Sequence, residues 1–247
     1  MSEHLIRARD LSLIVPTYKP SQRDLLSNPR RLLADLYLTR DKRETITLLD
    51  RLNFTLAPGE RLGVIGPNGA GKSTLLRVIA GIYPVSEGEL LVNGNAQGLF
   101  DVRYGMDFQG TGLENIYLRG LQMGLNLKEV RDLIPTVVEF AELDDAINDP
   151  IRIYSTGMLL RLGFAISTMI EPDILLLDEW IGSSDARFRE KTQARMNELI
   201  DSSRGLVLAT HNIALMDSLC DRALVLVNGQ ILFDGPVANA QDFYHKM

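Results

Sequence analysis

The stretch GPNGAGKS, residues 66–73, limits the folds that this chain can adopt. It matches the pattern G-x-x-x-x-G-K-[ST] and lies between an apolar run, RLGVI, and a helix-forming segment, TLLRVIAG. Glycines in such a loop let backbone N–H groups turn toward phosphate oxygens, while the lysine adds a positive charge and the serine a hydroxyl for Mg²⁺. The stretch therefore predicts a strand, a loop and a helix that bind a nucleoside triphosphate. The residues expected to hold it are Gly66, Asn68, Gly69, Ala70, Gly71, Lys72, Ser73 and Thr74.

Polar side chains follow two further apolar runs. The run ILLLDEW (174–180) contains Asp178 and Glu179, and His211 follows GLVLAT (205–210). Asp178 is expected to hold Mg²⁺ together with Ser73, and Glu179 to polarise an attacking water. His211 is expected at the edge where α/β sheets bind ligands, close to the γ-phosphate. The catalytic residues predicted from these positions are Glu179, His211 and Lys72.

The apolar runs also predict the fold class. Residues 61–66, 173–178, 205–210 and 223–227 are short, nearly continuous apolar stretches flanked by glycine and charge. Such runs are typical of strands buried on both faces of a mostly parallel sheet, and the helical patterns between them indicate an α/β architecture. Asn228-Gly229 between two apolar runs predicts an antiparallel hairpin.

Composition narrows the class of protein. The chain has 247 residues, is 45% hydrophobic and carries a net charge of −6, so no global basic surface for nucleic acid is expected. Its single cysteine, Cys220, excludes an intrachain disulfide and fits a reducing compartment. No apolar run reaches the length of a membrane span, and the N-terminus does not have the pattern of a signal peptide.

Two segments differ from this α/β pattern. Residues 113–170 are mostly helical and predict an inserted helical subdomain, in which Pro135 is expected to end or kink its helix. Residues 16–44 form a basic N-terminal insertion with seven Lys/Arg against four acids, and Asn28-Pro29 predicts the start of an amphipathic helix there. Such a helix is typical of one that docks on a partner or a membrane surface, but equally of an ordinary surface helix.

The segment RIYSTGMLLRLGFAI, residues 152–166, predicts a polar turn that leads into a helix. Ser155 at its start can serve as an N-cap, a role that serines often play. The first N–H groups of a helix can also bind an anion, because they have no partner within the helix. These residues alone leave both interpretations open.

The order of these motifs resembles a known family. It runs from the phosphate loop through a helical segment to YSTGM (154–158), ILLLDE (174–179), SSD (183–185) and ATH (209–211). The order resembles the nucleotide-binding subunit of ABC transporters from about residue 45 onward, with YSTGM at the signature, SSD at the D-loop and His211 at the switch histidine. The resemblance implies an ABC-type P-loop ATPase with a mostly parallel core sheet, antiparallel β-hairpin elements and an inserted helical subdomain.

The resemblance also implies the cofactors and the composition of the site. ATP with Mg²⁺ would be sandwiched between two copies of the chain. One copy would contribute the phosphate loop, Asp178, Glu179 and His211, and the other would contribute Ser155 and Gly157 at its helix start.

Three stretches resemble one branch of this family in particular. They are YSTGM, TGLENIYLRG (111–120) and DARFREK (185–191). They are similar to the ATPases that export bacterial cell-surface polysaccharides such as O-antigen, capsule and teichoic acid. The resemblance implies a homodimer bound to two copies of a membrane permease at the cytoplasmic face of the inner membrane, with a lipid-linked polysaccharide as the transported substrate. It also implies one ABC ATPase domain over residues 1–247, without the C-terminal carbohydrate-binding domain that some relatives carry.

The sequence departs from the family pattern at three places. No glutamine clearly matches the Q-loop, because Gln109 lies close to Glu114. The aromatic residue expected to stack on adenine is Tyr18, although the spacing of PTYKP is unusual for the family. In the signature, Thr156 replaces a glycine and Met158 replaces a glutamine, whereas Ser155 and Gly157 remain.

Other functions remain as alternatives. The chain could be the ATPase subunit of another ABC transporter, an importer or a lipid exporter, although an importer is expected to carry a clear Q-loop glutamine. A soluble ABC ATPase outside transport is a further alternative. Members that act in DNA repair carry a long coiled coil before the signature, and translation factors carry two cassettes. The sequence has neither feature.

Replacing Glu179 with glutamine tests its predicted role. The Glu179→Gln variant should bind ATP but hydrolyse it very slowly, because the amide cannot polarise the attacking water. The ATP-bound form should accumulate as a dimer, which size-exclusion chromatography with ATP would detect. Near-normal turnover in a phosphate-release assay would remove Glu179 from the catalytic role.

Overall fold

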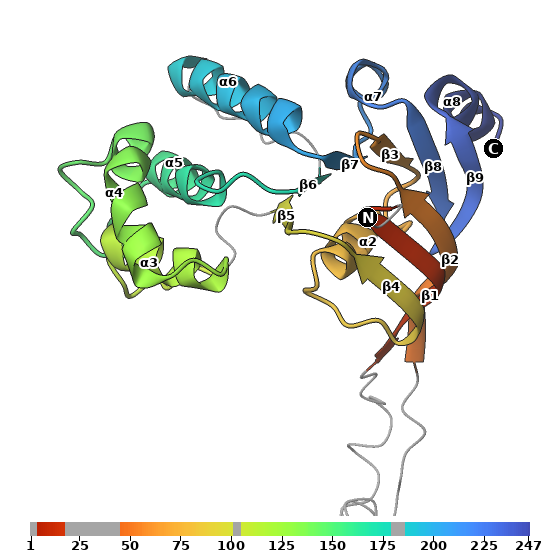
Figure 1. Ribbon diagram of the computed structural model, residues 1–247, viewed down its shortest axis with the longest axis horizontal. Coiled ribbons are helices and arrows are strands. Elements are labelled where there is room, and N and C mark those ends of the chain that lie inside the picture. The colour runs from red at the N-terminus through yellow and green to blue at the C-terminus, as the bar shows by residue number, and fades with distance from the viewer. Residues whose placement is uncertain (1–3, 18–44, 101–104, 179–185) are drawn as a thin grey trace, which may run out of the picture.

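The computed structural model describes residues 4–17, 45–100, 105–178 and 186–247. Its larger sheet has the strand order β5-β6-β7-β3-β8-β9, in which only β8 and β9 pair antiparallel (Figure 1). The strands are β3 (Arg61–Ile65), β5 (Ala96–Leu99), β6 (Ile174–Asp178), β7 (Gly205–Ala209), β8 (Arg222–Val227) and β9 (Gln230–Pro236). The four predicted buried runs form β3, β6, β7 and β8, and nearly all their residues are buried. The prediction of a mostly parallel core sheet is confirmed.

The predicted hairpin joins β8 to β9. Val227 pairs with Gln230 across the two-residue turn. Asn228 and Gly229 both have positive φ angles, 48° and 77°. A type I′ turn needs this conformation at both central positions, which is why Asn-Gly predicts it.

A second, smaller sheet packs beside the first. Its strands are β1 (Ile6–Pro16), β2 (Thr45–Leu56) and β4 (Glu87–Val92), all antiparallel in the order β2-β1-β4. The pairing of β1 with β2 shifts register after Ala8, and the nearby Asp10 and Arg51 have positive φ angles of 46° and 47°. Such irregularities bend a strand pair and increase its twist.

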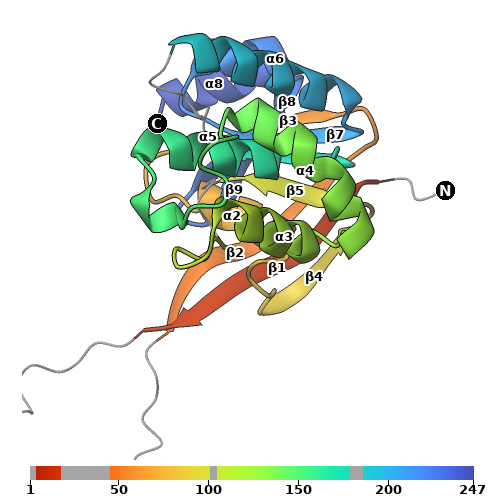
Figure 2. The same cartoon turned by 90° about the vertical axis from the view of Figure 1, so that its left-hand side faces the viewer.

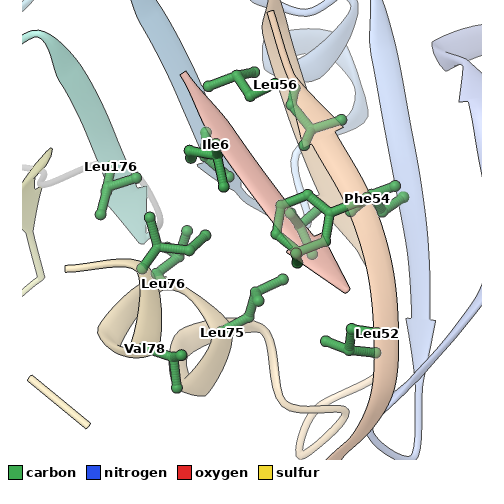
Figure 3. Packing of buried hydrophobic residues seen from close by; sticks show 14 of the residues in the cluster. Ile6, Leu52, Phe54, Leu56, Leu75, Leu76, Val78 and Leu176 are labelled. Atoms are coloured by element: carbon green, nitrogen blue, oxygen red, sulfur yellow. The ribbon is translucent and has the colours of Figure 1, made fainter. Parts of the chain in front are cut away.

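Helix α2 (Lys72–Ile79) lies between the two sheets and connects their cores (Figure 3). Its apolar face meets inward-facing side chains of β1 and β2 on one side and of β6 on the other. The cluster includes Ile6, Leu52, Phe54 and Leu56 of the smaller sheet, Leu75, Leu76 and Val78 of α2, and Leu176 of β6. Because α2 begins at the phosphate loop, this core also fixes the direction in which that loop faces.

Three helices cover the opposite face of the larger sheet, and two of them are labelled above it in Figure 2. They are α6 (Ala186–Ser202), α7 (Ile213–Leu219) and α8 (Val237–His245). Met196 of α6, Met216 of α7 and Val237 of α8 belong to one buried cluster with the strands below them. Every central strand is therefore covered on both faces, as its continuous apolar sequence requires.

The predicted helical stretch contains α3 (Gly112–Gln122), α4 (Leu127–Ala141), a 3₁₀ turn (Ile151–Ile153) and α5 (Thr156–Ser167). Capping boxes start α3 and α4, with Thr111 and Glu114 at the first and Asn126 and Glu129 at the second. The helices share a buried cluster of their own. In Figure 1 they lie to the left of both sheets.

Pro135 lies inside α4, and the helix continues past it to Ala141. Of the two outcomes expected at Pro135, the end of the helix is therefore not observed. Val137, Val138 and Ala141 after the proline are buried in the helical cluster, and this packing offsets the hydrogen bond that the proline cannot make.

Several predictions concern residues outside those that the structure describes. These are the basic insertion with Tyr18, the catalytic Glu179 and the SSD motif at 183–185. Across the described ranges, no helix is both long enough and apolar enough to cross a membrane.

An ion-pair network joins the edge of the larger sheet to the smaller one. Arg222 of β8 holds both carboxylate oxygens of Asp234 on β9, at 2.5 and 2.6 Å. Its remaining nitrogen donates to Glu60 at 2.7 Å and to the carbonyl of Thr55 in β2 at 3.2 Å. These contacts raise the pKa of the Arg222 guanidinium above its ordinary value, mainly through Asp234.

Replacing Arg222 with methionine should lower the free energy of unfolding by about 2 kcal/mol. Both carboxylates lose a charge-assisted partner, but part of that loss is recovered because they keep access to water. Arg222→Lys should recover less than half of the loss, because an ammonium cannot serve both carboxylates in the planar geometry of a guanidinium. Urea unfolding monitored by circular dichroism measures both values. A change within about 0.5 kcal/mol for the methionine variant would show that the network is not stabilising.

Candidate active site

The phosphate loop lies where three parallel strands of the larger sheet end. Strand β3 runs into the loop, β6 ends at Asp178, and His211 follows two residues after the end of β7. Because the carboxyl ends of parallel strands lie at one edge of a sheet, these segments meet around a single cavity of about 500 Å³. Its lining residues are Leu48, Asn68, Gly69, Gly71, Lys72, Ser73, Thr74, Asp178 and His211.

Two predicted nucleotide-binding residues, Gly66 and Ala70, shape the loop without lining this cavity. A Cβ on Gly66 would lie 1.9 Å from the carbonyl oxygen of Leu226 in β8, so no other residue fits there. Ala70 is 2% exposed, and its carbonyl accepts a hydrogen bond of 3.0 Å from the N–H of Gly229. Both residues therefore hold the loop against the β8–β9 hairpin.

Lys72 is held inside the loop. Its Nζ donates to the carbonyls of Gly66 at 2.8 Å and Pro67 at 3.0 Å, and the residue is 8% exposed. The N-cap of α2 is Gly71, in the left-handed region at φ 106°, and the first turn of α2 carries no acidic residue. The helix start therefore offers backbone N–H groups next to a fixed positive charge, which is the arrangement that binds phosphate.

Ser73 and Asp178 line this cavity, and their hydroxyl and carboxylate oxygens suit a divalent cation. Among the described residues, no group of three or more His, Cys, Asp or Glu side chains is placed to hold a metal ion. One hydroxyl and one carboxylate nevertheless fit Mg²⁺, which usually takes few protein ligands and completes its shell with phosphate oxygens and water.

His211 is positioned by hydrogen bonds of its two neighbours. The hydroxyl of Thr210 accepts from the N–H of Asn212 at 3.0 Å. The side chain of Asn212 then caps α7 by accepting from the N–H of Leu215 at 3.1 Å. The backbone around His211 is thus fixed between the end of β7 and the start of α7, while His211 itself is exposed at the cavity.

Leu48 lines the cavity but was not predicted from the sequence. It lies on β2, and its carbonyl would be 3.2 Å from a Cβ on Gly71. No local pattern around Leu48 indicates a ligand contact. Only the position of the smaller sheet beside the phosphate loop brings this residue to the cavity.

Ser155 and Gly157 do not line this cavity. The Ser155 hydroxyl accepts from the N–H of Met158 at 3.2 Å, so Ser155 is the N-cap of α5. Ser155, Thr156 and Gly157 are all exposed. The capping interpretation of Ser155 is confirmed, and none of the lining residues described for the phosphate cavity belongs to this turn.

A model of the family described as "ABC transporter" matches residues 49–182, which include the phosphate loop, the helical stretch and Asp178. The chain belongs to the ABC transporter family. This family binds ATP, and the cavity at the phosphate loop is the candidate site for the nucleotide.

Two curated relatives of this ABC ATPase are export proteins. The chain is 44% identical over 187 residues to the O-antigen export system ATP-binding protein RfbE of Yersinia enterocolitica, covering 76% of this chain and 78% of RfbE. It is 37% identical over 213 residues to the teichoic acids export ATP-binding protein TagH of Bacillus cereus (strain ZK / E33L). That match covers 86% of this chain but 39% of TagH, so the chain spans less than half of the longer relative.

Solved structures show the same fold. The ATP-binding subunit of an ABC transporter superposes with a TM-score of 0.69 at 22% identity, covering 97% of this chain and 93% of the other. An ATP-binding cassette solved as a dimer in a post-hydrolysis state with ADP and Pi gives 0.65 at 20% identity, covering 94% and 98%. The predicted ABC-type fold is confirmed.

Replacing two glycines of the loop with alanine should distinguish the effect of a steric clash from the effect of backbone strain. Gly66→Ala should weaken ATP binding at least about tenfold and lower the melting temperature, because the Leu226 carbonyl must move. At Gly69 the φ of 79° is strained for alanine, but no atom lies within 4 Å of the added Cβ. Gly69→Ala should therefore cost only about 1 kcal/mol of stability. Titration with a fluorescent ATP analogue and thermal melts measure both effects, and equal losses in the two variants would contradict this assignment.

Proposed function

We propose that this ABC ATPase powers the export of a lipid-linked cell-surface polysaccharide, of the O-antigen, capsule or teichoic-acid type, through a membrane permease. The observation that carries the proposal is a cavity lined by the phosphate loop, Asp178 and His211 in a chain that is 44% identical to an O-antigen export ATP-binding protein. The name of the teichoic-acid relative supports the same class of substrate.

The nucleotide in this proposal is ATP with Mg²⁺. Lys72 and the start of α2 would bind its phosphates, and Ser73 and Asp178 would hold the cation, which screens the charge on the phosphates. Glu179 would polarise the attacking water, and His211 would contact the γ-phosphate. Tyr18 remains the residue proposed to stack on adenine, with Leu48 as a further apolar contact at the cavity.

The second half of each site would come from another copy of the chain. Gly157 supports this, because among the described residues a Cβ there would meet only the Ser155 hydroxyl, at 3.9 Å. Nothing in the described part of one chain therefore requires a glycine at this exposed helix start. Close approach by a phosphate held on a second subunit would require it. A related cassette has been solved as a dimer with ADP and Pi.

The working cycle follows from this two-part site. ATP bound to one subunit would attract the Ser155 turn of the other, and the closed dimer would exclude bulk water. Hydrolysis would remove the shared phosphate and release the dimer, which couples the cycle to the permease.

The assembly in this proposal is two copies of the chain with two copies of the permease. The permease would hold the ATPase at the cytoplasmic face of the inner membrane. Within the chain we propose one ABC ATPase domain over residues 1–247, with residues 113–170 as its helical subdomain and 16–44 as a basic insertion. No nucleic acid takes part.

Aspartate at Gly157 should separate ATP binding from dimerisation. An acidic residue in the first turn of a helix interacts favourably with the helix dipole. The Asp side chain also has room at this position, so α5 should stay folded. It would repel the γ-phosphate of the other subunit. Gly157→Asp should therefore bind ATP within about twofold of the native affinity but hydrolyse it at least about tenfold more slowly. Cells whose only copy is this variant should lose the polysaccharide from their surface.

The matched control is Leu127→Asp, which adds the same charge at the exposed start of α4. This variant should hydrolyse ATP and support export normally. Normal hydrolysis by Gly157→Asp would contradict the two-subunit site. Unchanged surface polysaccharide in cells that express the hydrolysis-deficient variant would contradict the proposed substrate.

A further inference from the structure

One face of α6 contacts the ends of both α4 and α5. Phe188, Lys191 and Arg195 are spaced by three and four residues, so they lie on the same side of the helix. Lys191 and Arg195 each donate to backbone carbonyls beyond their own helix. Neither cation touches the ATP cavity, and the mechanism proposed above uses neither.

Lys191 binds the C-terminal end of α4. Its Nζ donates to the carbonyl of Phe140 at 2.9 Å and, at 3.3 Å, to that of Glu139. The ammonium also lies over the Phe140 ring, 4.8 Å from its centroid, and 3.5 Å from the carboxylate of Glu142. The last turn of α4 has no basic residue of its own. Lys191 therefore supplies the positive charge that the carbonyl end of a helix favours.

Arg195 binds the C-terminal end of α5. Its Nη2 donates to the carbonyl of Thr168, the C-cap residue, at 2.7 Å, while its Nη1 is held by Glu198 at 2.9 Å. The last turn of α5 likewise carries no basic residue. Two cations one turn apart on α6 thus bind the carbonyl ends of two different helices.

Apolar packing around these contacts leaves space. The rings of Phe140, Phe164 and Phe188 join α4, α5 and α6, with centroids 5.8 to 6.4 Å apart. Beside them lies a cavity of about 450 Å³, lined in part by Val137 and Ala194. Apolar contact is non-directional and the packing here is incomplete, so the directional contacts are those made by Lys191 and Arg195.

An adjacent face of α6 packs against the larger sheet. Met196, Leu199 and Ile200 are buried in the cluster beneath β6 and β7. Figure 1 shows α6 extending from the sheets toward α4 and α5. The helix therefore connects the rigid sheet with the far ends of the two helices.

We propose that Lys191 and Arg195 are positioning residues that set the orientation of α4 and α5 relative to the larger sheet. Helix α5 has 12 residues, so it is about 18 Å long, with Thr168 at one end and Ser155 at the other. A tilt of about 10° at the Arg195 contact displaces Ser155 by about 3 Å. Displacements of about 1 Å in a catalytic arrangement can cost about a hundredfold in rate. This consequence for hydrolysis rests on the proposed two-subunit site.

The orientation can be measured without ATP. Spin labels at Leu127→Cys on α4 and Leu232→Cys on β9 would report the distance between the helical part and the sheet, because both positions are exposed. The native Cys220 should not interfere, since burial raises the pKa of its thiol to about 12. In the labelled chain the distance distribution should be narrow, and Lys191→Met with Arg195→Met should broaden or shift it. Methionine keeps the apolar stems of both side chains but removes the donors.

Conservative and matched variants complete this test. Lys191→Arg with Arg195→Lys keeps both charges and should retain the narrow distribution. Arg131→Met removes an exposed cation from the outer surface of α4 and should have no effect. An unchanged distribution in the double methionine variant would overturn the proposal, and so would equal broadening in Arg131→Met.

Hydrolysis provides the second readout. The double methionine variant should bind ATP as a monomer within about twofold of the native chain but hydrolyse it at least about tenfold more slowly. Parallel losses of binding and hydrolysis would show a merely structural role and overturn the proposal. If the distribution broadens while the native chain shows no hydrolysis, the proposed function fails and the positioning role stands.

Discussion

The close approach of β8 to the phosphate loop is the constraint on which the rest of the site depends. The carbonyl of Leu226 occupies the space that a Cβ on Gly66 would need, and the N–H of Gly229 donates to the carbonyl of Ala70. These contacts fix the loop against the β8–β9 hairpin. Lys72 can then donate back to the carbonyls of its own loop while it lines the cavity. A chain without glycine at position 66 could not bring these elements together.

The site that we propose has one half built into the sheets and one half built into the helical cluster. The phosphate half is held between two cores, because α2 packs against both the smaller and the larger sheet. The Ser155 turn belongs instead to the helical cluster, is exposed, and meets no part of the cavity. Its placement depends on α6, whose cations bind the carbonyl ends of α4 and α5. In the proposed two-subunit site, this geometry determines where the Ser155 turn meets the phosphate bound by the other copy.

Local chemistry explains what could be predicted from the sequence. Four short runs are almost continuously apolar, so strands formed by them must be buried on both faces. These runs form β3, β6, β7 and β8. The Asn228-Gly229 turn was predictable because few residue pairs adopt two positive φ angles. Pro135 did not end its helix, because local propensity was outweighed by the burial of the residues after it.

Three features could be predicted from the residues alone: the phosphate loop, the polar residues Asp178 and His211 at the ends of β6 and β7, and the family to which the chain belongs. These depend on residue type at fixed spacing, which is local information. The tertiary structure alone decided that Leu48 lines the cavity and that Lys191 and Arg195 reach the ends of α4 and α5. Each of these contacts joins elements far apart in the chain, and the partner is a backbone carbonyl or an open cavity that leaves no pattern in the sequence. Any residue can supply a backbone carbonyl, so only the packing of the helices determines which cation reaches it.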